Sequence, residues 1–141
     1  MPAPFTAEPP AQAWLETFLA REGGIAGTVH RRQGDQLFLI AAVRIPPPVL
    51  QITAVIPSGK GMAGLALERR QPVQTCNLQT DQTGVVRPGA RAVNAQAAVA
   101  LPVFDSSGEI RAVVGIAYDH EQELPPEKIR ALSAAAASVP A

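Results

Sequence analysis

The segment spanning residues 95–119, AQAAVALPVFDSSGEIRAVVGIAYD, restricts the fold more than any other feature of the sequence. Two long, mostly apolar runs flank the polar turn at residues 105–108, which predicts a β-hairpin. A second pair of apolar runs surrounds Gly34 and Asp35, and its second member, residues 37–43, is apolar on both faces, as a covered strand would be. Hairpins pair their strands in antiparallel fashion, so the sheet should be antiparallel.

The remaining elements predict a mixed α+β domain. Helical spacing of apolar residues predicts one helix at the start of the chain, one at residues 61–70 and one at its end. The terminal helices carry apolar stripes made of Trp14, Leu15, Phe18 and Leu19, and of Ile129, Leu132, Ala136 and Val139. Strands are expected near residues 25–31, 36–43, 73–76, 95–104 and 110–118. Regular structure is not expected around Pro46, Pro47 and Pro48, because proline lacks a backbone donor.

Composition narrows the class of protein. A chain of 141 residues, 47% apolar and 17% charged, should form one globular domain, here residues 10–138 after a flexible tail at 1–9. Twelve basic and twelve acidic residues give zero net charge, so the basic face that nucleic-acid binding requires is not expected. No apolar run is long enough to span a membrane, and the first residues do not resemble a signal peptide. A cytoplasmic location is therefore expected.

The segment GKGMAG, residues 59–64, has the G-x-G-x-x-G spacing of dinucleotide-binding folds. Such folds need repeated strand–helix–strand units and a parallel sheet, and this chain offers at most one such unit. The motif alone is therefore weak evidence for nucleotide binding. The interpretation that we favour is that Gly59 and Gly61 form a turn, while Gly64 lets a helix pack closely against the sheet.

Two segments resemble the signatures of GAF domains. Residues 56–78, IPSGKGMAGLALERRQPVQTCNL, are similar to the central signature, and residues 97–118 are similar to the second one. The resemblance covers residues 10–138. It implies an antiparallel sheet of five to six strands with the terminal helices on one face. The middle helix and long loops would cover a small-molecule pocket on the other face.

This sequence also departs from the family pattern. Many members have an aspartate after the short strand, where this chain has Thr75-Cys76-Asn77-Leu78. The Asn-Lys-x-Asp-Glu sequence of members that bind cyclic nucleotides is absent, and the cysteine or histidine positions of tetrapyrrole-binding members are not matched. The resemblance therefore names no cofactor.

The polar segment after residue 74 is the best place to expect a ligand. Its candidate ligand-binding residues are Thr75, Asn77, Gln79, Asp81, Arg91 and Asn94. Arg91, Asn77 and Asp81 are expected to face a cavity bounded by the middle helix and the strand at residues 95–104. Arg91 could bind a carboxylate or phosphate through two hydrogen bonds. The alternative is that these side chains cap turns, with Arg91 and Asp81 paired to each other.

Three other residues could carry chemistry. Cys76 is the single cysteine, which excludes an internal disulfide, and it is expected to be a buried apolar group without catalytic function. Some GAF proteins reduce free methionine sulfoxide with several cysteines around the pocket, so that activity is disfavoured here. His30 and His120 are expected to be ordinary solvent-facing residues. No metal site is expected, because no cluster has the spacing of metal ligands.

The sequence thus favours a freestanding, non-catalytic GAF-like module that senses a small molecule and passes a signal to a separate effector protein. The second hypothesis is a protein-interaction or dimerisation module with a vestigial pocket, and a redox enzyme is third. A homodimer built on residues 10–22 and 125–138 is also hypothesised, because alanine permits close approach of helices and GAF relatives often dimerise through their terminal helices. The alternative is that both stripes cover the back of the sheet.

Overall fold

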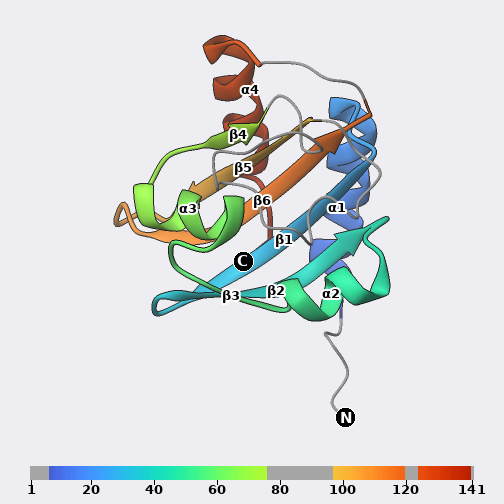
Figure 1. Cartoon of the computed structure of the whole chain (residues 1–141). Coiled ribbons are helices and arrows are strands. Elements are labelled where there is room, and N and C mark those ends of the chain that lie inside the picture. Colours follow the sequence, from blue (N-terminus) through green and yellow to red (C-terminus); the bar gives the residue numbers. More distant parts are fainter. Residues whose placement is uncertain (1–6, 76–96, 120–123, 141) are drawn as a thin grey trace.

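A computed structural model describes residues 7–75, 97–119 and 124–140. Within these ranges the strands form one six-stranded antiparallel sheet in the order β3-β2-β1-β6-β5-β4 (Figure 1). The strands are β1 (Ala26–Gln33), β2 (Gln36–Val43), β3 (Val55–Pro57), β4 (Val73–Thr75), β5 (Ala97–Phe104) and β6 (Ile110–Tyr118). The two predicted hairpins, β1–β2 and β5–β6, are confirmed, and β6 pairs with β1 to join them in the centre of the sheet.

The terminal helices α1 (Pro9–Glu22) and α4 (Pro126–Ala136) pack on one face of the sheet. Leu15 of α1 and Leu132 of α4 are fully buried in the same apolar cluster as Val29 and Val114 of the central strands. Trp14 stacks on Phe18 with ring centroids 4.8 Å apart. The apolar stripes of both helices therefore cover the back of the sheet, as the alternative to an exposed dimer surface predicted.

The opposite face carries α2 (Pro47–Thr53) and α3 (Gly61–Arg69), which lie in front of the sheet in Figure 1. The prediction of irregular structure around the three prolines is wrong, because α2 and β3 both form in that segment. Pro47 and Pro48 stand at the first positions of α2, where a backbone N–H has no partner within the helix. Proline is therefore tolerated there.

The glycines of residues 59–64 have the architectural roles predicted for them. Gly59 and Gly61 adopt φ values of 86° and 65°, the left-handed region that a tight turn before α3 requires. A Cβ atom on Gly64 would lie 2.6 Å from the backbone oxygen of Pro57, so this glycine permits α3 to approach β3. In the described part of the chain, no helix is long and apolar enough to cross a membrane.

Candidate functional site

A cavity of about 160 Å³ lies between the sheet and the two helices α2 and α3. Much of its floor is formed by small residues on the three strands β1, β5 and β6, namely Ala26, Thr28, Ala98, Ala100, Gly115 and Ala117. Val49, Ile52 and Thr53 of α2 and Met62 and Ala63 of α3 line it from above. Because the floor residues are so short, they leave space between sheet and helices that larger residues would fill.

His30 is the one titratable residue among the described residues that line this cavity. Its side chain is 2% exposed, and its Nε2 lies 2.9 Å from the backbone oxygen of Thr53 in α2. A carbonyl oxygen can only accept, so Nε2 carries the proton and donates it. Burial lowers the pKa of His30 to about 4, although the hydrogen bond to Thr53 acts in the opposite direction. The imidazole is therefore neutral at pH 7.

The other ring nitrogen of His30, Nδ1, is buried without a hydrogen-bond partner among the described residues. In the neutral ring with Nε2 protonated, Nδ1 is an acceptor. The expectation that His30 faces solvent is wrong. The strand that contains His30 was predicted nearly at its observed bounds. The side chain of His30 is buried because α2 covers it, and α2 forms in the proline-rich segment for which no regular structure was expected.

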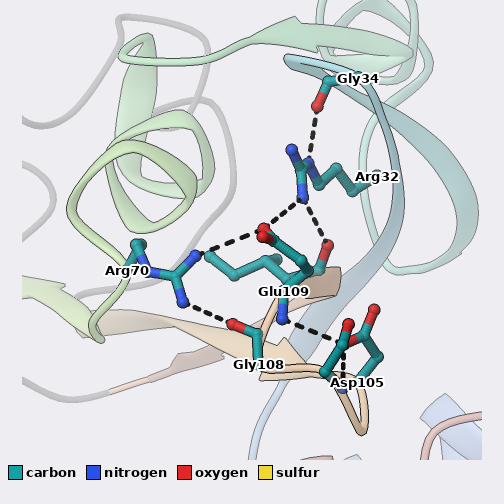
Figure 2. Close-up of polar contacts among 8 residues, drawn as sticks. Arg32, Gly34, Arg70, Asp105, Gly108 and Glu109 are labelled. Carbon is teal, nitrogen blue, oxygen red and sulfur yellow. Dashed lines mark hydrogen bonds and ion pairs between the residues drawn. The ribbon is translucent and has the colours of Figure 1, made fainter.

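A second polar cluster, formed by Arg32, Arg70, Asp105 and Glu109, lies at the ends of the two hairpins (Figure 2). The Glu109 carboxylate lies 3.4 Å from Arg32 and 3.6 Å from Arg70. The two guanidinium groups also donate hydrogen bonds to backbone oxygens. Arg32 donates to Gly34 in the turn of the first hairpin, and Arg70 donates to Gly108 in the turn of the second. Each charged group in the cluster is thus engaged by protein groups, and the cluster connects the two turns and the end of α3.

Asp105 belongs to the same cluster and shapes the turn of the β5–β6 hairpin. Its Oδ1 accepts hydrogen bonds from the hydroxyl and backbone N–H of Ser107 and from the N–H of Glu109. These bonds, that from the Ser107 hydroxyl first, hold the pKa of Asp105 below its usual value. No group of three or more residues suited to hold a metal ion occurs in the part of the chain that the structure describes.

The family model described as GAF domain matches residues 12–139, nearly the whole chain. The chain belongs to the GAF domain family. A search of curated proteins found no match.

Solved structures share the GAF fold of this chain at low sequence identity. The GAF domain/HD domain protein from Geobacter sulfurreducens is 11% identical with a TM-score of 0.68, over 92% of this chain and 88% of that one. The GAF domain of an Acinetobacter phosphoenolpyruvate-protein phosphotransferase is 10% identical with a TM-score of 0.66, over 88% and 72%. A type II free methionine-R-sulfoxide reductase from Thermoplasma acidophilum is 18% identical with a TM-score of 0.67, over 87% and 82%. At these identities the likeness concerns the fold.

The cavity of this GAF domain lies on the face predicted for a pocket, but most of the predicted ligand-binding residues cannot be placed in it. Thr75 is buried at the end of β4 opposite Ala98, so the two side chains are on the same face of the sheet. The other candidates, Asn77, Gln79, Asp81, Arg91 and Asn94, lie outside the described residues, as do Cys76 and His120. Their convergence on a ligand stays a prediction.

The sequence analysis missed the residues that form the cavity. A signal for the floor was present in the β5–β6 hairpin, where small and large residues alternate at positions 98–101 and 114–117. Ala98, Ala100, Gly115 and Ala117 line the cavity, whereas Leu101 and Val114 belong to the core cluster beneath α1 and α4. Val99 and Ile116 are members of that cluster and also line the cavity. Strand residues alternate between faces, so this pattern predicts unfilled space on one face over this part of the sheet.

Proposed function

We propose that this GAF domain is a non-catalytic module that binds a small, mostly apolar molecule in the cavity beneath α2 and α3. The observation that carries the proposal is the cavity itself. It is a partly open space whose described lining is mostly apolar with few polar residues, which is the usual composition of a small-molecule site. Binding would be reported to a separate effector protein.

A reductase activity is not part of this proposal, although reductases are among the proteins with a similar fold. The chain has one cysteine, so it cannot resolve an oxidised thiol by forming a disulfide within itself. Because dithiothreitol can itself reduce a sulfenic acid, it also tests for catalysis by a single cysteine. We expect Cys76 to be non-catalytic, and therefore no turnover of free methionine sulfoxide by the wild type or by Cys76→Ser. Turnover that the Cys76→Ser variant loses would instead assign the protein to the reductases.

The homodimer predicted from the terminal helices is not required for this function. The buried residues of α1 and α4, including Leu15, Phe18 and Leu132, are already used within the chain. A dimer through these helices would have to use their exposed sides. Size-exclusion chromatography with light scattering, with and without a bound ligand, tests whether ligand binding changes the oligomeric state.

The test of binding is a screen of uncharged single-ring compounds by ligand-observed NMR, with two matched variants. Ala98→Leu places a larger side chain on the cavity floor, whereas Ala131→Leu makes the same change at an exposed position of α4. Compounds that bind the wild type should bind Ala131→Leu equally and Ala98→Leu at least about tenfold more weakly, because the space is filled. Equal binding to all three proteins would place the site elsewhere. No binding to any of them would favour the interaction module.

A further inference from the structure

We infer that the hydroxyl of Thr28 anchors the ligand of this cavity. The ligand is then a neutral, mostly apolar molecule of single-ring size with one polar oxygen, as in an alcohol, a phenol or a ketone. Thr28 lies in β1, one of the two central strands of the sheet (Figure 1). This inference rests on the proposed function and deepens it by naming the anchoring residue and the chemical class of the ligand.

The side chain of Thr28 points from the sheet toward α2 and α3. Its neighbours in β1 face the other side, because a Cβ atom on Gly27 would meet Leu19 of α1 and Val29 belongs to the cluster beneath α1 and α4. Strand residues alternate between the two faces. Thr28 therefore faces the cavity, whose lining includes it.

A glycine opposite Thr28 leaves its hydroxyl uncovered. Thr28 pairs with Gly115 of β6, and a Cβ atom on Gly115 would lie only 2.8 Å from Oγ1 of Thr28. Both residues are partly exposed, whereas Ala26 and His30, the next residues of β1 on this face, are buried. Because the sheet continues on both sides of this pair, the exposed surface of Thr28 faces the cavity.

The Thr28 hydroxyl is accessible and makes no hydrogen bond with the described residues. In the described part of the chain, the fully buried polar side-chain atoms without a partner are Nδ1 of His30 and the hydroxyl of Tyr118, so that of Thr28 retains accessible surface. The other hydroxyl of the described lining, on Thr53, already donates to the backbone oxygen of Val49 at 2.8 Å. The O–H of Thr28 is therefore the one left to donate to a ligand.

The free O–H favours a ligand that has a polar oxygen. A hydrocarbon placed over the hydroxyl would remove water from it without replacing the hydrogen bond, which is unfavourable. The oxygen of an alcohol, a phenol or a ketone accepts that hydrogen bond instead. The remainder of the ligand contacts the apolar part of the lining, which includes Val49 and Met62.

Size and charge limit the ligand further. The cavity of about 160 Å³ is close to the volume of about 150 Å³ at which an apolar cavity in another protein holds a benzene-sized molecule. None of the described lining residues carries a charge at pH 7, because the pKa of His30 is about 4. A charged ligand would lose its hydration without gaining an ionic partner from them, which disfavours its binding.

Phenol and toluene test the inference, because they have the same shape and differ by a hydroxyl in place of a methyl group. Cyclohexanone and methylenecyclohexane make the same comparison for a carbonyl group. Dissociation constants are measured by NMR titration at pH 7 for the wild type and two matched variants. Thr28→Val keeps the shape of the side chain and removes the hydroxyl, whereas Thr28→Ser keeps the hydroxyl.

The preference for the oxygen compound should depend on the hydroxyl. The ratio of phenol affinity to toluene affinity, or that of the ketone to its hydrocarbon, should be about tenfold higher in the wild type than in Thr28→Val. Thr28→Ser should retain most of the wild-type ratio. Benzoate, a charged compound of similar size, should show no measurable binding to the wild type.

The outcomes separate the inference from the proposed function. If the compounds bind and both affinity ratios are the same in the wild type and Thr28→Val, the inference is overturned while the proposed function stands. A ratio that Thr28→Ser loses as fully as Thr28→Val, or benzoate binding tighter than phenol binding, also overturns it. If no compound binds the wild type, and the screen of uncharged compounds gives no ligand, both the inference and the proposed function fail.

A measurement on the wild type keeps the test valid if a variant does not fold. Nuclear Overhauser effects are recorded between bound phenol and the methyl group of Thr28, whose signal is assigned by selective labelling of threonine. The ring protons next to the phenol hydroxyl should give stronger effects than the proton opposite it, because the hydroxyl points toward Thr28. The reverse order would show that the phenol oxygen points away from Thr28, and the inference would be wrong.

Discussion

The two faces of the sheet are built from the same strands and differ in how they are filled. Beneath α1 and α4, side chains such as Leu101, Val114 and Ile116 interdigitate with Leu15 and Leu132 in one continuous buried cluster. The opposite face is only partly filled. Leu37 and Val113 form a second buried cluster with Leu67 of α3, whereas alanine and glycine elsewhere on this face leave a cavity with a buried histidine in its lining. The residues around the cavity therefore lack dispersion contacts that the residues of the two buried clusters have.

The largest expected effect concerns the filled face. Leu15→Ala removes a fully buried side chain that lies against Gly27, and it should lower the free energy of unfolding by about 3–4 kcal/mol. Val49→Ala, which enlarges a space that already exists beneath α2, should cost about 1 kcal/mol or less. Urea denaturation of both variants measures the difference. Equal costs, after allowance for the larger leucine side chain, would contradict the contrast between the faces.

A second prediction concerns the pH dependence of stability that His30 causes. Its pKa is about 4 in the folded chain and 6.5 when unperturbed, so between these values the unfolded state binds more protons. The contribution of neutral His30 to the free energy of unfolding should therefore be complete above pH 6.5. It should fall by about 3 kcal/mol as the pH decreases to about 4. Urea denaturation across this range should show that fall in the wild type.

The control for this prediction is His30→Leu, measured in parallel so that the titration of carboxyl groups cancels. The difference in pH dependence between the two proteins should equal the contribution of His30. His120→Gln should retain the dependence of the wild type. A wild-type curve parallel to that of His30→Leu would show that the side chain is accessible to protons in the folded state.

The third prediction concerns the approach of α3 to the sheet. Gly64→Ala should destabilise the domain by about 2 kcal/mol, because its Cβ would meet the backbone oxygen of Pro57 and α3 would have to move. Gly34→Ala is the control, since it also adds one methyl group but meets no atom within 4 Å. Its positive φ of 64° should cost about 1 kcal/mol. Thermal denaturation would refute the packing role of Gly64 if the two variants were equal.

The smallest effect is expected from the ion pair between Glu8 and Arg31. Two hydrogen bonds of 2.6 and 2.7 Å join the groups, and the Arg31 hydrogen bonds lower the pKa of Glu8. Both side chains are about one third or more exposed, so solvent screens the pair, and Glu8→Gln should cost about 0.5 kcal/mol or less at pH 7. A cost well above 1 kcal/mol would contradict this.

Because the pKa of Glu8 is lowered in the folded chain, the stability that the ion pair contributes should decrease at acidic pH. The contribution of Glu8 should be present above about pH 4.5 and disappear as the pH falls through its folded pKa. High salt should reduce it at pH 7. Glu127→Gln, an exposed position in the first turn of α4, is the control for loss of a surface carboxylate.

The strands and helices that show a clear periodic pattern of apolar residues were predicted well from the sequence. The strand at residues 36–43 has the predicted bounds in β2, and that at residues 110–118 has them in β6. The buried faces of the terminal helices were also predicted, because helical spacing places leucines of one stripe on one side. These features depend on neighbouring residues in the chain.

The features that depend on distant segments were not predicted. Burial of His30 requires α2, which follows 17 residues later, and the hydrogen bond to Thr53 cannot be derived from the strand that contains His30. The three consecutive prolines predict irregular structure because proline lacks a backbone donor, but the first turn of a helix accepts proline. The volume of the cavity depends on the distance between the sheet and the helices above it. The periodicity of apolar residues along a helix contains no information on that distance.

The prolines at the start of α2 have a consequence for how the cavity stays open. A helix of seven residues is too short to be stable alone in water. Pro46, Pro47 and Pro48 restrict φ even in the unfolded chain, so less conformational entropy is lost when this segment becomes ordered. α2 therefore needs fewer contacts with the sheet to hold its place than a flexible segment of the same length. The restricted backbone of residues 46–48 thus helps α2 to remain ordered above the cavity, where dense packing is missing.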